Sequence, residues 1–345
     1  MVFPVILFAI GLQVFLTIRK VSPFLSLLLV AVIAGALLGM SPEAILQSIE
    51  SGVGSTLGGL ALIICLGAIL GKILEEGGAA EKISSTLIGS FGQKNIQWAV
   101  MFTGFLVGIP LYYNAGFVIL VPLVFSIARR TGLPLLYIAI PMAAALSTTH
   151  CFLPPHPGPV VLVNAFEADM GKTLVYGMII TIPVVILAGP VLGRFLKTVP
   201  VSINPLFAVK AGDQAKKSPA AFPSFLIALL PVLLITLAVI TQYLLKDVTL
   251  LKKILLFIGD PTIALLIAVL LAAWQFGIRT GQGMEKTMKW LSDAISGIAL
   301  ILLIITAGGV FKQVLTDSGT GQYIASFSSQ WQMPPLLFAW IVTAL

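Results

Sequence analysis

The segment GAILGKILEEGGAAEKIS, residues Gly67–Ser84, is repeated later in the chain as GGVFKQVLTDSGTGQYIA, residues Gly308–Ala325. The two copies align without gaps, and upstream of them LALIICL lies over ILLIITA in the same register. With a small shift, the segment from Pro23 to Gly39 lies over the segment from Pro261 to Gly277. The chain therefore contains two copies of one unit.

The composition is that of an integral membrane protein. Of the 345 residues, 58% are hydrophobic and 10% are charged, whereas soluble domains carry about 25% charged residues. Apolar runs of roughly 17–25 residues, long enough to cross a bilayer as helices, recur along the whole chain. The sequence therefore predicts an all-α polytopic membrane protein whose first partner is the lipid bilayer. Predicted spans lie at about 2–18, 24–40, 57–74, 97–109, 111–128, 134–149, 173–195, 222–244, 255–276 and 290–311.

Lys and Arg residues cluster in the short segments between the apolar runs. The net charge of +7 therefore reports membrane topology, and we expect no nucleic-acid partner. Glu75, Glu76 and Glu81 are predicted to lie in a solvated cytoplasmic loop. Three dipeptides have an N-cap residue before proline and predict helix starts: Ser22-Pro23, Ser41-Pro42 and Asp260-Pro261.

The paired apolar runs at 97–128 must enter and leave on the same membrane face to satisfy the charge pattern. Two full spans or a re-entrant hairpin would both do so. Pro110, Pro122 and the turn GIPLYYNAG favour the hairpin. The first copy then crosses the membrane an odd number of times, so the second copy is inverted. Inverted repeats are typical of secondary transporters, although a channel stays an alternative.

The predicted domain organisation follows from the repeat. Residues 1–200 form the first copy, 201–221 a polar linker and 222–345 the second, inverted copy. The second copy ends inside an apolar segment, LLFAWIVTAL. A second hairpin and a second broken helix, roughly ninety residues, are therefore expected beyond this chain.

The stretch HCFLPPHPGP, residues His150–Pro159, interrupts a predicted helix at about 134–167. Prolines lack the backbone donor, so the helix must break at Pro154. Broken backbone at membrane depth persists only when it is buried in protein or lines a wet cavity. A half-helix then begins after the break, and we expect its dipole and unpaired amides to bind an anion such as a carboxylate.

Side chains next to this break suit a polyhydroxylated anion. Hydroxyls of Ser147, Thr148 and Thr149 lie beside the His150 imidazole, although such hydroxyls often bond back to their own helix carbonyls. His150 and His156 titrate near neutral pH and are candidates for carrying a coupled proton. A structural hydrogen bond is the alternative for each. No catalytic residue or cofactor is expected, and a metal site lacks a third ligand nearby.

The hairpin turn adds further candidates, although its aromatic residues are also typical of an interfacial belt. The predicted substrate-binding residues are Tyr113, Asn114, Gly116, Ser147, Thr148, Thr149, His150, Pro155, His156, Gly158 and Asn164.

Several motifs resemble the gluconate:proton symporter (GntP) family of the ion transporter superfamily. They include GGLALIICLGAILGKILEEGGAAEKI, NIQWAVMFTGFLVG, MAAALSTTHCFLPPHPGP, ADMGKTLVYG and GGVFKQVLTDSG, and the resemblance runs from the first helix to residue 345. It implies paired inverted repeats, re-entrant hairpins and a transport unit that moves against a scaffold. In the family an acidic residue commonly stands where this chain has Asn114, so the proton carrier is expected elsewhere, for example at His150.

The resemblance implies a function as well as a fold. It implies proton-coupled import of gluconate or a related sugar acid across the bacterial inner membrane, with the anion and protons as partners. Idonate, fructuronate, 2-keto-3-deoxygluconate and D-serine are alternative substrates, and a homo-oligomer is left open. A membrane-embedded metal-dependent enzyme using His150 and His156 is the least favoured alternative, since we expect no enzyme.

Overall fold

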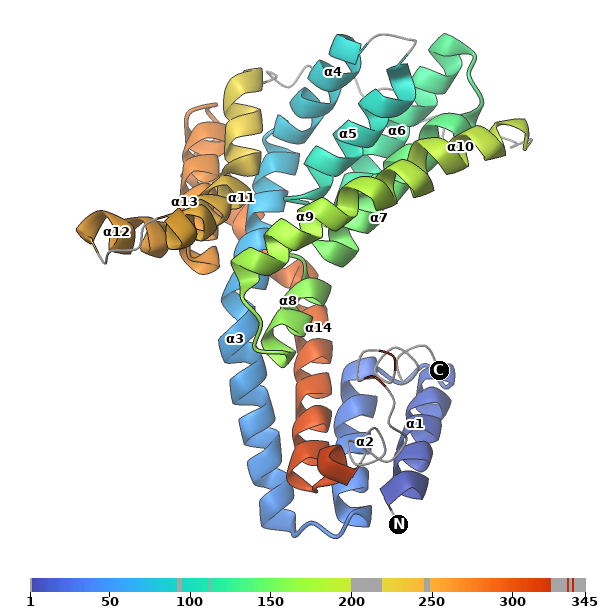
Figure 1. Ribbon diagram of the computed structural model, residues 1–345, viewed down its shortest axis with the longest axis vertical. Helices are drawn as coiled ribbons and strands as arrows, with labels where there is room; N and C mark the ends of the chain where they lie inside the picture. The colour runs from blue at the N-terminus through green and yellow to red at the C-terminus, as the bar shows by residue number, and fades with distance from the viewer. Residues whose placement is uncertain are drawn as a thin grey trace. The chain divides into compact units, whose positions relative to one another are not determined.

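The computed structural model describes residues 2–91, 95–111, 113–199, 219–244 and 249–323, together with residues 334 and 337. Over these residues the regular structure is entirely helical (Figure 1). Six helical segments of the described chain are long and apolar enough to cross a membrane: Pro42–Glu76, Leu135–Ala165, Met170–Thr198, Ala221–Gln242, Pro261–Ile278 and Met284–Asp317. The predicted all-α polytopic membrane protein is therefore confirmed.

The chain begins with helices α1 (Val2–Ile18), α2 (Pro23–Leu37) and α3 (Pro42–Glu76). The predicted starts are confirmed, since α2 and α3 begin at the proline. The Ser41 hydroxyl accepts a hydrogen bond from the Ala44 N–H at 3.2 Å, whereas Ser22 makes no side-chain bond to its helix. A proline at the first helical position costs nothing, because that N–H has no intrahelical partner.

Two helices were missed by the sequence prediction. Helix α4 (Ala79–Phe91) lies in the segment that was predicted to be a solvated loop, and α12 (Leu250–Ile258) precedes α13 (Pro261–Ala272). The predicted span at 255–276 is therefore wrong at its start. Gly259 is the C-cap of α12. Asp260 then caps α13, because its carboxylate accepts from the N–H groups of Thr262 at 2.9 Å and Ile263 at 3.3 Å.

The remaining helices are close to their predicted positions. They are α5 (Ile96–Gly108), α6 (Tyr113–Thr131), α7 (Leu135–Phe152), α8 (Pro157–Ala165), α9 (Met170–Ile186), α10 (Leu192–Phe195), α11 (Ala221–Leu244) and α14 (Met284–Asp317). A π-helical turn at Leu187–Val191 joins α9 to α10, and another at Ala273–Ile278 extends α13. The predicted linker at 201–221 lies mostly outside the described residues.

The chain divides into two compact units, Met1–Ala61 with Ala299–Leu345, and Leu62–Ile298. In the first unit the start of α3 packs against the end of α14. Gly52 allows this approach, since a Cβ there would lie 2.7 Å from the Val310 Cα. Ser48 bonds to Asp317, and Thr56 lies against Gly309. Residues of increasing number on α3 therefore contact residues of decreasing number on α14, so these two parts are antiparallel.

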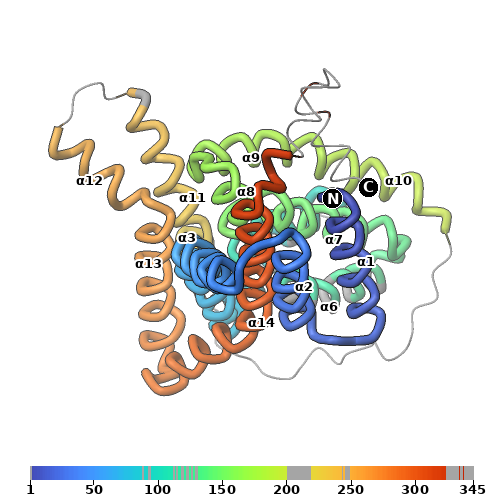
Figure 2. The backbone as a smooth tube through the Cα atoms, turned by 90° about the horizontal axis from the view of Figure 1, so that it is seen from below, coloured from blue at the N-terminus to red at the C-terminus, as the bar shows by residue number. Residues whose placement is uncertain are grey.

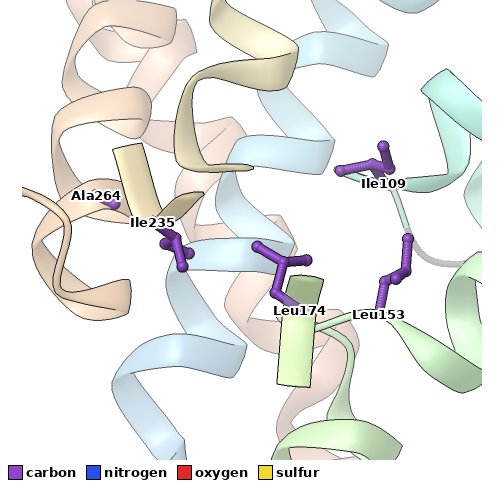
Figure 3. Packing of buried hydrophobic residues seen from close by; sticks show 5 residues of the cluster. All are labelled: Ile109, Leu153, Leu174, Ile235 and Ala264. Carbon is purple, nitrogen blue, oxygen red and sulfur yellow. The ribbon is translucent and has the colours of Figure 1, made fainter. Parts of the chain in front are cut away.

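In the second unit, α4, α5, α6 and α7 lie side by side (Figure 1). Helices α5 and α7 approach closely at Gly104, where a Cβ would lie 2.9 Å from the Met142 carbonyl oxygen. Helix α12 lies between α11 and α13 in the chain and contacts α11 (Figure 2). An apolar cluster joins the end of α5 to α9, α11 and α13 (Figure 3): Ile109, Leu153, Leu174, Ile235 and Ala264. Leu153 belongs to the predicted helix break, so this cluster packs the break against the neighbouring helices.

Candidate functional site

The predicted helix break lies between α7 and α8. Helix α7 ends at Phe152, Leu153 is extended, and α8 begins at Pro157 with His156 as its N-cap. The Leu153 N–H still donates to the Thr149 carbonyl at 3.0 Å, and the His156 N–H donates to the Leu153 carbonyl at 3.2 Å. The break is therefore a short, hydrogen-bonded turn.

The start of α8 offers fewer free amides than the sequence led us to expect. Pro157 and Pro159 have no N–H, and the Val160 N–H donates to the His156 carbonyl at 3.1 Å. The prolines remove donors as well as breaking the helix. The remaining first-turn amide is that of Gly158, where a Cβ would meet nothing within 4 Å. An anion at this helix end would thus have one backbone N–H and the helix dipole.

The two histidines are in contact across the break. Their Nδ1 atoms lie 3.2 Å apart, and the His156 Nε2 lies 2.8 Å from the Gly108 carbonyl oxygen. A carbonyl can only accept, so the His156 Nε2 carries a hydrogen. His156 is 2% exposed and His150 is half-buried. The bond to Gly108 ties the break to the last residue of α5.

The hydroxyls before the break turn toward their own helix. The Thr148 hydroxyl donates to the Ala144 carbonyl at 2.7 Å. The Thr149 hydroxyl lies 3.0 Å from the Ala145 carbonyl and 2.9 Å from that of Leu146. Both threonines are buried and Ser147 is exposed. Both threonine hydroxyls therefore donate to carbonyls of their own helix, which was the alternative to substrate contact. Towards a ligand they could act as hydrogen-bond acceptors through their lone pairs.

One face of α3 brings the break and the α5–α6 turn together. A Cβ on Gly67 would lie 3.4 Å from the Pro155 Cγ, and one on Gly71 would lie 2.8 Å from the Pro110 carbonyl oxygen. Small residues four apart allow such close packing in membrane helices. The G-x-x-x-G spacing of GAILG was the sequence signal for this contact, and neither glycine was predicted as a site residue.

A narrow crevice lies where these segments meet. Its free volume is about 10 Å³, which is room for roughly one water molecule. It is lined by residues from the break, the turn and neighbouring helices, among them Gly67, Pro110, Pro154, Pro155, Met170 and Pro231. The lining is apolar, so in this conformation the crevice is too small and too dry for a sugar acid.

The other predicted residues are distributed around the break. Gly116 on α6 is buried, and a Cβ there would lie 2.7 Å from the Leu146 Cδ2. Tyr113 stacks on Phe117 with ring centroids 5.7 Å apart. Asn114 belongs to α6, but its side chain lies outside the described residues. Asn164 is exposed near the end of α8, about 9 Å along the helix from Gly158. The structure thus brings Gly116 to α7 and leaves Asn164 apart from the break.

Gln97 supports α7 and was not predicted as a site residue. Pro141 has no N–H for the carbonyl of Tyr137 four residues earlier. The Gln97 side-chain amide supplies that missing donor at 2.9 Å, and it also approaches the Pro190 carbonyl at 3.4 Å. Gln97 belongs to the NIQWAV motif, so part of that motif satisfies the carbonyl that Pro141 leaves without a donor.

Within the described residues, no group of three His, Cys, Asp or Glu side chains is placed to hold a metal ion.

Comparison with known proteins identifies the family. The model of the GntP family permeases matches residues 1–345. The chain belongs to the GntP permease family. It is a multi-pass permease of the bacterial inner membrane, as the resemblance implied, and not an enzyme.

Similar proteins in this family have named substrates. The high-affinity gluconate transporter of Escherichia coli (strain K12) is 47% identical over 346 residues, covering 99% of this chain and 79% of that protein. The Gnt-II system L-idonate transporter of the same organism is 45% identical over 351 residues, with the same coverage. The gluconate permease of Bacillus subtilis (strain 168) is 38% identical over 359 residues, covering 99% and 79%.

Proposed function

We propose that this GntP permease is a proton-coupled importer of gluconate or a closely related sugar acid. The observation that carries the proposal is the meeting of the helix break with the α5–α6 turn. At this meeting the His150–His156 pair, the Gly158 amide and the start of α8 lie together. The names of its relatives, gluconate and L-idonate transporters, support the same substrate class.

The substrate carboxylate would bind at the start of α8. The Gly158 N–H and the positive end of the helix dipole attract an anion there. Protonated His150 would supply the opposite charge. The substrate hydroxyls would be recognised by the polar groups of Tyr113, Asn114, Ser147, Thr148 and Thr149, with Gly116, Pro155 and His156 shaping the site. The remaining candidate, Asn164, lies farther along α8. The crevice must open for this, as alternating access requires.

An inverted repeat would provide the moving parts. Helices α3 and α14 have 35 and 34 residues and end at Glu76 and Asp317, which are equivalent in the repeat. Glycines at equivalent positions follow, Gly78 and Gly319, each with φ of 75°. The antiparallel packing within the first unit supports the inversion. A re-entrant course of α5 and α6 and the two-copy division at 201–221 belong to the same proposal.

Uptake of labelled gluconate tests the function. The product of the full-length gene is reconstituted into vesicles with an inside-alkaline pH gradient, and vesicles without protein serve as the control. We expect saturable accumulation that collapses with a protonophore and that unlabelled gluconate inhibits. Gradient-independent, non-saturating flux would indicate a channel instead. Absence of uptake for every sugar acid tried would overturn the proposal.

Competition identifies the substrate within the class. Unlabelled L-idonate, fructuronate, 2-keto-3-deoxygluconate and D-serine are added to the gluconate assay at equal concentration. Because the proposed site has a carboxylate position and several hydroxyl partners, we expect the sugar acids to compete more strongly than D-serine. Stronger inhibition by D-serine would move the substrate to the amino acids.

A further inference from the structure

The turn between α13 and α14, residues 279–283, joins two membrane spans. The apolar segment Pro261–Ile278 ends before it and the apolar segment Met284–Asp317 begins after it (Figure 2). A short connection between two spans lies at the level of the lipid headgroups. Gly281 and Gly283 have φ of 83° and 82°, and a Cβ on either would meet nothing within 4 Å. The backbone of this turn is therefore accessible at the membrane surface.

The turn and its flanks are basic. Between residues 274 and 290 the chain has three basic residues, Arg279, Lys286 and Lys289, and one acidic residue, Glu285. These four side chains are exposed. Lys289 lies one helical turn after Glu285, which partly offsets its charge. Arg279 and Lys286 have no acidic residue three or four positions away on either side.

Arg279, at the end of the first span, is held by uncharged groups. Its Nη1 donates to the Gln275 Oε1 at 3.1 Å, and its Cζ lies 5.5 Å from the centroid of the Trp274 ring. Trp274 is 52% exposed, which is typical of an indole in the interfacial belt. A guanidinium group has five N–H donors and Gln275 accepts from one nitrogen, so Arg279 keeps donors for a ligand.

Lys286, in the first turn of α14, is held in the same way. Its Nζ donates to the Gln282 Oε1 at 2.6 Å and lies 5.8 Å from the centroid of the Trp290 ring. Among the described residues, no carboxylate lies within 4 Å of the Lys286 Nζ or of the Arg279 guanidinium nitrogens. A glutamate in place of either glutamine would form an ion pair within the helix. Glutamine instead orients each cation and leaves its charge uncompensated.

The two cations flank one contact between the helices. Gly277 lies directly against the side chain of the buried Thr287, so the end of α13 packs against the start of α14. Arg279 follows Gly277 by two residues, and Lys286 precedes Thr287 by one. Both charges therefore belong to one small surface at the end of the two spans.

We propose that Arg279 and Lys286 bind the phosphate of an anionic phospholipid. Arg279 donates two N–H groups to the phosphate oxygens, and Lys286 supplies the second positive charge. The positive-inside rule places this turn on the cytoplasmic face, where anionic lipids attract basic residues. The lipid chains lie against exposed apolar side chains beside the two cations: Trp274, Ile278 and Met284. This proposal does not depend on the transported substrate.

Quenching of Trp274 fluorescence tests the proposal. The product of the full-length gene is placed in phosphatidylcholine bilayers that contain a small fraction of phosphatidylglycerol brominated near the headgroup. The difference from Trp274→Phe isolates the Trp274 signal. Because bromine quenches on contact, we expect stronger quenching than with brominated phosphatidylcholine at the same fraction. Equal quenching by the two lipids would show that the basic residues only orient the protein, and would overturn the proposal.

Single-charge variants locate the lipid. In Arg279→Gln and in Lys286→Gln, the fraction of phosphatidylglycerol that gives half-maximal quenching should rise roughly fivefold. Gln282→Glu keeps Lys286 but gives it a carboxylate one turn away, so it should have a similar effect. Lys253→Gln and Lys312→Gln are the matched controls, since each removes one exposed charge elsewhere. If the controls weaken binding as much, net charge rather than this turn attracts the lipid, and the proposal fails.

Two further measurements separate the remaining outcomes. Arg279→Lys keeps the charge and should retain most of the lipid preference, whereas a loss as large as in Arg279→Gln would show that the charge is not what binds. Inorganic phosphate in the buffer should leave the quenching unchanged. Loss of the preference in its presence would assign the site to a soluble anion and overturn the lipid as its occupant. Should a variant fail to insert, the comparison of the two brominated lipids on the unmodified protein still decides.

Discussion

The ends of α3 and α14 have the same local structure and different surroundings. Each helix ends with an acidic residue held from one turn earlier: Lys72 pairs with Glu76 at 3.0 Å, and the Gln313 amide donates to Asp317 at 2.9 Å. Each is followed by a glycine with φ of 75°. The repeated sequence therefore determines how both helices end.

The packing of the two ends differs. In its unit, α3 presents Gly67 and Gly71 to Pro155 and Pro110. In its unit, α14 has Gly308 at the first of these positions, where a Cβ would meet nothing within 4 Å, and an exposed Lys312 at the second. In both units the aligned sequence forms a long helix. The second position carries glycine where a neighbouring backbone approaches and lysine where the side chain is exposed.

Alanine at Gly71 should have the largest effect. Its Cβ would meet the Pro110 carbonyl oxygen at 2.8 Å, and overpacking of this kind costs about 1–3 kcal/mol. We expect a lower Tm of the purified protein and loss of most uptake. Gly308→Ala is the matched control, since the same gain in helix propensity comes without a clash. If Gly308→Ala lowers the Tm as much, the two faces do not differ as described.

Alanine at Gly78 or at Gly319 should destabilise the two helix ends about equally. Both residues lie in the left-handed region, which costs an L-residue roughly 1–2 kcal/mol. Thermal unfolding of the two single variants measures this, with Gly308→Ala as a helical-glycine control. A much larger loss for one of them would show that the helix ends are not local structures.

Alanine at Asp317 should destabilise the protein somewhat more than alanine at the equivalent Glu76. Asp317→Ala removes acceptors for both Gln313 and Ser48, the latter at 2.5 Å, and we expect a loss of about 1 kcal/mol or more. Glu76→Ala removes a partly exposed ion pair with Lys72 within one helix, worth about 0.2–0.5 kcal/mol. Tm values of the two variants test the order. Ser48→Ala should reproduce part of the Asp317→Ala loss, and no loss in Ser48→Ala would contradict the link between α3 and α14.

Gln97→Leu tests the support of α7 outside the repeated segment. It would leave the buried Tyr137 carbonyl without the donor that replaces the Pro141 N–H, at a cost of about 1–3 kcal/mol. Gln97→Asn keeps the amide on a shorter side chain and should recover less than the full Tm. A wild-type Tm for Gln97→Leu would show that this hydrogen bond does not stabilise α7.

Most of the fold could be predicted because the positions of membrane helices follow from local sequence patterns. Length, hydropathy, proline and capping residues predicted the helix starts at Pro42 and Pro261, and a break at Pro154, close to the observed end of α7 at Phe152. Helices α4 and α12 were missed, because one is less apolar and both are shorter than a span. The motifs also identified the family, because each of them is a continuous stretch of sequence that can be recognised without the structure.

The candidate site was predictable only in part. HCFLPPHPGP indicated a break, and the two histidines were candidates from their residue type. Their direct contact, the bond from His156 to Gly108, and the role of Gly67 and Gly71 join segments far apart in the chain. No local pattern encodes such pairings. The prediction of several free amides at the start of α8 was wrong. Pro157 and Pro159 have no N–H, and the Val160 N–H is hydrogen-bonded to the His156 carbonyl.

The sequence by itself determined that this protein crosses the membrane, that helices begin at Pro23, Pro42 and Pro261, and to which family it belongs. These properties follow from composition, period and backbone chemistry, which act within a few turns of helix. Only the tertiary structure decided which histidine nitrogen meets which partner and which glycine receives a neighbouring backbone. Those contacts depend on distances between separate helices, which packing alone sets.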